Sequence, residues 1–195
     1  MNDKTDILTA FNSPAIEKRL SEVMNRKEKN AFLESIMTHP NAMVLYETNG
    51  HKTILFPGNK GPKTITWEQT KQMAIELNRQ GIEIAFLPEL EDSTSTDSLV
   101  KIGNNYWLAD FKYCITTKSN TLAKELEEGF GQAKTLVLKL QKMDLGEFKE
   151  AINYLLRNEI PYGDIILMNK YGNTVAITYK DIKTGKFVRK TKGFL

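Results

Sequence analysis

The sequence predicts an α/β protein in which helices flank a mixed β-sheet. Segments with helical periodicity alternate with short apolar runs that are typical of strands. From residue 66 the predicted order is helix, three strands, helix, strand, helix and further strands, which favours a layered α/β domain. The chain has 195 residues, 41% hydrophobic and 26% charged, which is the composition of a globular protein.

Residues 1–64 form a predicted N-terminal attachment of one helix and one β-hairpin. The helix spans residues 14–38, where an apolar stripe recurs at helical spacing. The hairpin turns at Asn49 and Gly50, a favoured pair for a two-residue turn between two apolar runs. In this interpretation the main domain comprises residues 65–195.

The main domain contains elements with clear local signals. Thr66 with Gln69, and Asp144 with Glu147, have the spacing of capping boxes at helix starts. Gly81 is suited to end the first of these helices. The predicted elements, in chain order, are helix 67–80, strand 82–87, a hairpin within 96–113, helix 121–133, strand 135–140, helix 145–158, and strands 164–169 and 174–179.

Several classes of protein are excluded by what the sequence lacks. No run of about 18 apolar residues occurs, so we expect no membrane span. The N-terminus has no basic start followed by an apolar core, so we expect no secretory signal and a cytoplasmic site of action. Cys114 is the single cysteine, which excludes an internal disulfide, and His39 and His51 alone offer little for a zinc site.

The positive charge is concentrated at the end of the sequence. The net charge is +3, and six Lys or Arg residues lie within residues 180–195. Such a basic tail is compatible with a polyanionic partner. The simpler interpretation, which we favour, is an exposed edge strand that lysines keep soluble.

The hairpin of residues 96–113 places charged side chains near the open ends of its strands. Asp97 opens the first strand. Because side chains alternate along a strand, Asp110 and Lys112 share one face of the second. The opposite, core-facing side takes Trp107, Ala109, Phe111 and Tyr113.

The turn of this hairpin decides which charged residues face each other. A two-residue loop that starts at Gly103 sets Asp97 opposite Asp110. A loop that starts one residue later sets Asp97 opposite Lys112, with Asp110 diagonal. A three-residue loop sets Ser98 opposite Asp110 instead. Opposed Cβ atoms lie about 4.5–5.5 Å apart, so either two-residue loop clusters the two acids.

Two carboxylates and a lysine in this arrangement predict metal-dependent hydrolysis of phosphodiester bonds. Facing carboxylates repel each other, and a divalent cation between them removes that cost. Mg²⁺ prefers carboxylate oxygens, and a held metal polarises phosphoryl oxygens. A neighbouring lysine can stabilise the developing charge or orient water. The alternative is that Lys112 pairs with an acid on a solvated face, a contact worth about 0–1 kcal/mol.

Residues 66–140 resemble the PD-(D/E)XK nuclease superfamily, whose restriction-endonuclease-like core is helix, three strands, helix, strand. Asp97 matches the acid of the second strand, and Asp110-Phe-Lys112 matches the (D/E)-x-K element. Thr96 stands where the superfamily pattern usually has proline, and the third-strand acid is Asp where Glu is commoner.

The resemblance implies further site residues and a cofactor. It implies catalytic roles for Asp97, Asp110 and Lys112, with Mg²⁺ or Mn²⁺ as the cofactor. Glu76 is similar to a helical glutamate found in many members, and Gln132 to a helical glutamine near the active site. Glu89, at the exit of the first strand, is a candidate third metal ligand beside Asp97 and Asp110, or else a solvated loop acid. Glu76 could equally face solvent, and Gln132 could cap or pack its helix.

A narrower resemblance concerns LNRQGIEIAFLPE, ADFK and GFGQAKTLVLKL. These segments look like nuclease domains of contact-dependent growth inhibition toxins, including a group acting on tRNA, and like domains in phage and mobile-element proteins. The resemblance implies a nucleic-acid substrate, either RNA such as tRNA or DNA, and a cognate immunity protein. The alternative function is a non-catalytic nuclease-like module that binds a protein or nucleic acid, because fold does not fix function.

Overall fold

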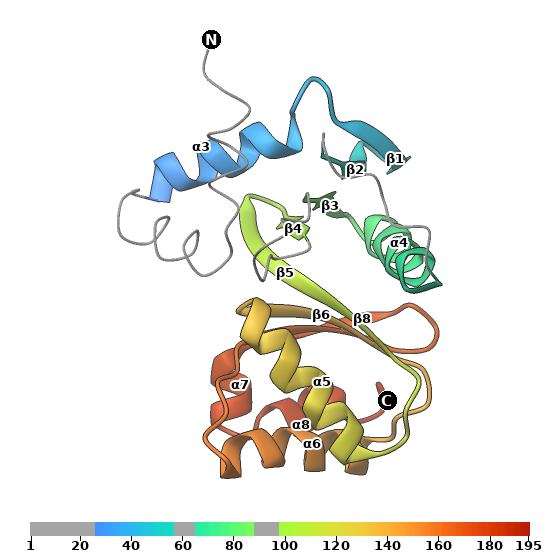
Figure 1. Ribbon diagram of the computed structural model, residues 1–195, viewed down its shortest axis with the longest axis vertical. Coiled ribbons are helices and arrows are strands. Elements are labelled where there is room, and N and C mark those ends of the chain that lie inside the picture. The colour runs from blue at the N-terminus through green and yellow to red at the C-terminus, as the bar shows by residue number, and fades with distance from the viewer. Residues whose placement is uncertain (1–25, 57–64, 88–97) are drawn as a thin grey trace. The chain divides into compact units, whose positions relative to one another are not determined.

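The computed structural model describes residues 26–56, 65–87 and 98–195 (Figure 1). The predicted α/β class is confirmed: eight strands form one mixed sheet in the order β1 to β8, and helices flank it. The chain divides into two compact units, Met1–Ala109 and Asp110–Leu195. Across the described ranges, no helix combines the length and apolar character needed to cross a membrane.

The described part of the first unit contains two helices and the strands β1 to β4, followed by the first half of β5. Strands β1 and β2 pair antiparallel, β2 and β3 pair parallel, and β3, β4 and β5 form an antiparallel meander. Its elements are α3 (Arg26–Met37), β1 (Met43–Thr48), β2 (His51–Leu55), α4 (Ile65–Asn78), β3 (Ile82–Phe86), β4 (Ser98–Ile102) and β5 (Asn105–Cys114).

The predicted hairpin of the N-terminal attachment is confirmed as β1 and β2. Asn49 and Gly50 have φ angles of 50° and 80°, which a two-residue turn of this kind requires at both positions. Strand β2 then lies parallel to β3, with Thr53 opposite Ile84, so the hairpin extends the sheet. The predicted domain boundary after residue 64 stays a prediction.

The signals predicted for the start and for the end of α4 have different outcomes. Helix α4 begins at Ile65, so Thr66 lies inside the helix and not at its cap. Gly81, with φ of 81°, ends the turn after α4 as predicted, and its N–H donates to the Asn78 carbonyl at 2.9 Å. Of the helix predicted over 14–38, the described part is α3, and the rest lies outside the described residues.

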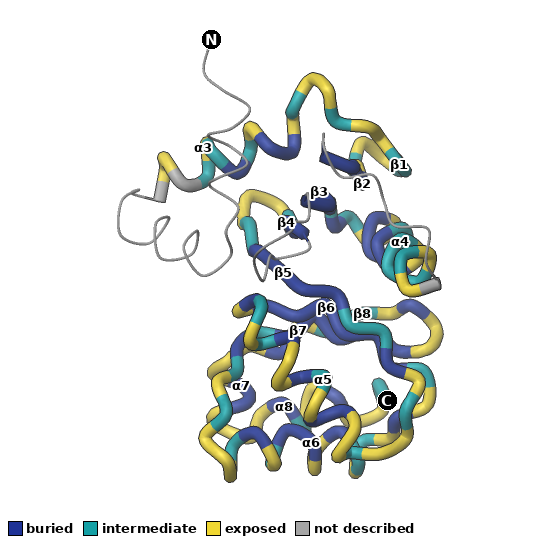
Figure 2. The backbone as a smooth tube through the Cα atoms, viewed as in Figure 1, coloured by how far each residue is buried: buried dark blue, intermediate teal, exposed yellow. Residues whose placement is uncertain are grey.

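The core of the first unit lies between α3 and the strands. Ile36 of α3 packs with Ile54 of β2, Leu99 of β4 and Leu108 of β5, and all four are buried. The buried stretches are the end of β2, the start of β4 and the middle of β5 (Figure 2). Burying an aliphatic side chain of this size contributes roughly 1.5–3 kcal/mol, so this cluster fixes β4 and β5 at the hairpin.

The second unit is built on a parallel β-α-β crossover, to which three further helices are added. Strands β6 and β7 are connected through α6 and pair with each other in parallel, and β8 pairs antiparallel with β7. Helices α5, α6 and α8 cover one face of these strands (Figure 1). The elements are α5 (Ser119–Gln132), β6 (Thr135–Leu140), α6 (Leu145–Arg157), β7 (Asp164–Met168), β8 (Thr174–Ile177), α7 (Tyr179–Lys183) and α8 (Phe187–Thr191).

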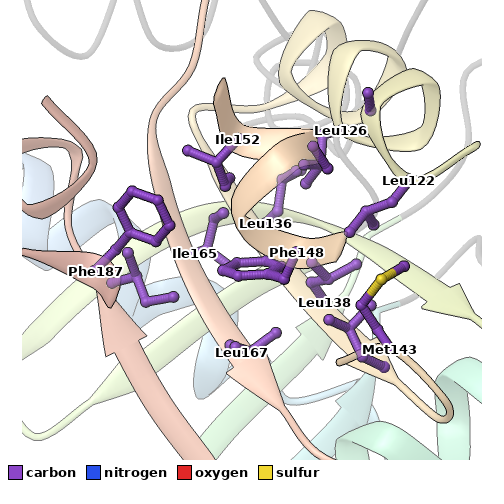
Figure 3. Packing of buried hydrophobic residues seen from close by; sticks show 14 of the residues in the cluster. Leu122, Leu126, Leu136, Leu138, Met143, Phe148, Ile152, Ile165, Leu167 and Phe187 are labelled. Carbon is purple, nitrogen blue, oxygen red and sulfur yellow. The ribbon is translucent and has the colours of Figure 1, made fainter. Parts of the chain in front are cut away.

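The core of the second unit is centred on Phe148 of α6. Its ring lies over the sheet beside Leu136, Leu138 and Ile165, and Phe187 of α8 meets it edge-on at 6.1 Å between centroids (Figure 3). Leucine and isoleucine at alternate strand positions present one apolar face to the helices, as the period of two requires.

Asp144 and Glu147 connect α5 and α6 at their N-termini. Asp144 Oδ1 accepts a hydrogen bond from the Glu147 N–H at 2.9 Å, which is half of the predicted capping box. The Glu147 carboxylate instead accepts from the Ser119 N–H at 2.8 Å. Because Lys118 at the N-cap of α5 gives no side-chain cap, Glu147 caps α5 in its place.

The basic tail forms helices, so the interpretation as an edge strand was wrong. Thr178 and Asp181 make a reciprocal capping box that starts α7. Lys190 donates to Asp181 Oδ2 at 2.6 Å, which joins α8 to α7. The hydrogen bond from Lys190, followed by those from Thr178, lowers the pKa of Asp181 from 3.8 to about 2. Ile182 and Phe187 face the core.

Candidate active site

The β4–β5 hairpin has the register that starts its two-residue loop at Gly103. Ile102 lies opposite Asn105 and Ser98 lies opposite Ala109. Gly103 has φ of 58°, which glycine adopts without steric cost at the first turn position. Of the three registers considered, this is the one that predicts Asp97 opposite Asp110. Asp97 itself lies outside the described residues, so that facing pair stays a prediction.

Asp110 is a buried carboxylate beside a lysine. Its side chain is 1% exposed, and Lys112 Nζ lies 3.1 Å from its Oδ2. The lysine side chain is 17% exposed, so Lys112 pairs with Asp110 as the alternative interpretation expects, but the pair does not lie on a solvated face. Although the two atoms are within ion-pair distance, Oδ2 accepts no aligned hydrogen bond from the described residues. The Lys112 ammonium compensates the charge of this buried carboxylate, while the lone pairs of Oδ2 stay open to another partner.

Helix α5 approaches the Asp110 carboxylate at a glycine. A Cβ atom placed on Gly129 would lie 3.2 Å from Asp110 Oδ2 and 2.8 Å from Cδ2 of Leu136. Glycine inside a helix costs about 1 kcal/mol relative to alanine, and here its lack of a side chain permits the close approach. Gln132 lies three residues later, on the same helix face and half-buried, at the end of α5.

The roles predicted for Glu76, Glu89 and Asp97 stay predictions. Glu76 lies on α4 in the first unit, where its carboxylate accepts from Gln72 Nε2 at 3.4 Å. Its predicted role near the active site stays a prediction. Glu89 and Asp97 lie outside the described residues. The structure therefore places Asp110 and Lys112 together, with Gln132 one helical turn beyond Gly129.

The described residues around Asp110 offer few ligands for a divalent cation. Among the described residues, no group of three or more His, Cys, Asp and Glu side chains is gathered that could hold a metal. Asp110 nevertheless offers a buried carboxylate oxygen that is ion-paired with Lys112 but accepts no aligned hydrogen bond within the described ranges, and carboxylate oxygen is the ligand that Mg²⁺ prefers. This atom fits a ligand position, and further ligands would have to come from Asp97 and Glu89.

Cys114 ends β5 and does not belong to the chemistry. Burial, with a smaller contribution from Glu125, raises the pKa of its thiol to about 12. The thiol is therefore protonated at neutral pH, and only the thiolate is a good nucleophile or metal ligand.

Sequence reasoning missed Gly129 as a residue that shapes the site. The segment GFGQ was interpreted as ordinary helix. The available signal was a glycine inside a helical pattern, which often marks close packing.

Comparisons with known proteins add little to this geometry. No model of a known protein family matches the chain. No curated protein matches it either. Among solved structures, the chain is similar to the CdiA-CT/CdiI toxin and immunity complex from Burkholderia pseudomallei, with a TM-score of 0.47 and 21% sequence identity. The alignment covers 65% of this chain and 98% of that chain. A likeness at this level does not establish a shared fold or activity.

Proposed function

We propose that the chain is a metal-dependent nuclease that hydrolyses phosphodiester bonds of nucleic acid. The observation that supports it most is the buried Asp110 carboxylate, whose Oδ2 lies 3.1 Å from the Lys112 ammonium and accepts no aligned hydrogen bond from the part of the chain that the structure describes. A carboxylate that is buried beside an ammonium group, with lone pairs left over, has the chemistry of a metal ligand next to a catalytic lysine.

Asp110 has the role of a metal ligand in this proposal, together with Asp97 and Glu89. Mg²⁺ or Mn²⁺ supplies polarisation of a phosphoryl oxygen and an acidified water molecule. Lys112, held beside the carboxylate, orients the attacking water and stabilises the negative charge that develops on the phosphate. Gln132 positions the substrate from the end of α5, and Glu76 supports the ligand set.

The substrate proposed is RNA such as tRNA, or DNA, and the setting is a toxin or mobile-element effector with a cognate immunity protein. This part of the proposal rests on the resemblance of the segments around Asp110 and Gln132. The exposed cations on α7 and α8 and at the ends of α8 fit phosphate contacts, and such contacts make binding fall as salt rises. The cations are Lys180, Lys183, Lys186, Arg189 and Lys192.

A cleavage assay tests the proposal. Purified protein is incubated with tRNA, plasmid DNA and single-stranded DNA in Mg²⁺, Mn²⁺ or EDTA. We expect cleavage that requires the metal, is lost in Asp110→Asn and Lys112→Met, and persists in Lys124→Ala, an exposed lysine on α5. Cleavage that survives EDTA and both substitutions would refute the mechanism. Binding without any cleavage would favour the non-catalytic module.

A further inference from the structure

A second candidate site lies at the carboxyl ends of the parallel strands β6 and β7. A cavity of about 450 Å³ opens there, lined by residues that follow the two strands. Gln141 and Lys142 come directly after β6, while Lys170 and Tyr171 follow β7. In α/β sheets this edge is where ligands commonly bind, and the volume lies within the range of small-molecule sites.

The loop after β7 is held in place by one buried side chain, Asn169. Its Oδ1 accepts hydrogen bonds from the N–H groups of Tyr171 at 3.0 Å and Asn173 at 3.1 Å. Its Nδ2 donates to the Phe194 carbonyl at 3.1 Å. The loop is therefore fixed before any ligand arrives, which lowers the entropy cost of binding.

The chemistry of the lining suits an anion that carries a planar ring. None of the described residues that line the cavity has an acidic side chain, while Lys142 and Lys170 are both exposed. Tyr171 is 76% exposed, which is unusual for a large aromatic ring. Lys170 Nζ lies 5.0 Å from its ring centroid, so the lysine and the ring form a paired feature at the mouth.

We propose that this cavity binds a 5′-phosphorylated nucleoside. The base stacks on Tyr171, because bases and aromatic rings stack favourably. The phosphate lies between Lys142 and Lys170, and the side-chain amides of Gln141 and Asn173 offer donors and acceptors to the base or sugar. The site uses none of the residues proposed for phosphodiester hydrolysis, so either proposal can fail without the other.

Calorimetric titration of the full chain with adenosine 5′-monophosphate tests this inference, with adenosine and ribose 5-phosphate as partial ligands. We expect the monophosphate to bind more tightly than either partial ligand. Tyr171→Ala should weaken binding roughly fivefold to a hundredfold through lost stacking, and Tyr171→Phe should retain it. Lys142→Ala and Lys170→Ala should each weaken binding of the monophosphate but not of adenosine.

Lys149→Ala is the matched control, because Lys149 is an exposed lysine on α6 outside the cavity. Its binding should equal that of the unmodified protein. Absence of binding at millimolar monophosphate overturns the proposal, as does binding that the Tyr171 and lysine substitutions leave unchanged. The nucleotide proposal is also overturned if ribose 5-phosphate binds as tightly as the monophosphate and Tyr171→Ala does not change the affinity. The cavity would then be a simple anion site. Thermal melting of each variant confirms that these exposed substitutions leave the fold intact.

Discussion

Lys112 Nζ lies 3.1 Å from Oδ2 of Asp110, two residues earlier on the same strand and almost wholly buried. Both side chains point to the same face because residues two apart on a strand do so. The pair brings a carboxylate and an ammonium group together away from bulk water, where their electrostatic interaction is stronger than at a surface.

Removing the ammonium group alone should destabilise the fold. Lys112→Met leaves the Asp110 carboxylate buried without its counter-charge, and we expect a loss of roughly 1–3 kcal/mol in the free energy of unfolding. The double variant Asp110→Asn/Lys112→Met carries no buried charge there and should recover part of this loss. Urea unfolding at neutral pH in EDTA measures both. Equal stability of the single and double variants would contradict a coupled pair.

Gly129→Ala should reverse the usual effect of alanine in a helix. The new Cβ would lie 2.8 Å from Leu136 in a buried core and 3.2 Å from Asp110 Oδ2, so we expect a net loss of about 1–3 kcal/mol. Gly131→Ala is the matched control on the same helix, because nothing lies within 4 Å of its Cβ position. That substitution should stabilise by about 0.5–1 kcal/mol. Stabilisation by both substitutions would show that Gly129 is not a close-contact position.

Gly163→Ala should prevent the start of β7 from pairing with β6. A Cβ atom at this position would lie 1.9 Å from the carbonyl oxygen of Lys134, a backbone atom that accepts from the Asp164 N–H at 2.9 Å. We expect a loss above about 4 kcal/mol or failure to fold. Circular dichroism and urea unfolding, again beside Gly131→Ala, measure it. A variant within about 1 kcal/mol of the parent protein contradicts this packing.

Stability should fall in acid partly through Asp181. Its pKa is lowered from 3.8 to about 2 in the folded chain, so the unfolded chain binds the proton more readily. The contribution is present above about pH 4 and is lost as the pH falls through about 2. Because Lys190 is 40% exposed, solvent screens the pair, and we expect only about 1 kcal/mol.

Lys190→Met tests this explanation, because it removes the hydrogen bond that contributes most to the lowered pKa of Asp181. The pKa of Asp181, followed by NMR of its side-chain carboxyl carbon, should move up towards its ordinary value. Lys186→Met is the control, since Lys186 is an exposed lysine outside the pair. An unchanged pKa in Lys190→Met would mean that Thr178 alone sustains the shift.

Local sequence patterns predicted most of the elements. The apolar run of residues 135–140 is a strand with the predicted bounds, and the hairpin about Asn49 and Gly50 formed as expected. The parallel pairing of β2 with β3 was not predictable, because a local sequence pattern does not determine which strands are hydrogen-bonded neighbours in the sheet. The helices after residue 178 were missed because their capping box has Asp181 where glutamate or glutamine is usual.

The candidate site was predictable in part. The alternation of β5 correctly put Asp110 and Lys112 on one face, and the register starting at Gly103 was among those considered. The burial of Asp110 could not be predicted from the strand alone. It depends on α5 passing at Gly129, a contact between residues far apart in the sequence.

The most direct test of the central claim is Mn²⁺ binding by the unmodified protein and by Asp110→Asn, measured by electron paramagnetic resonance. The account predicts a specific Mn²⁺ site that is weakened about tenfold or more by Asp110→Asn. Asp144→Asn, which changes an exposed carboxylate at the start of α6, should leave it unchanged. Equal Mn²⁺ affinity in the unmodified protein and Asp110→Asn, or no binding by either, would contradict the account.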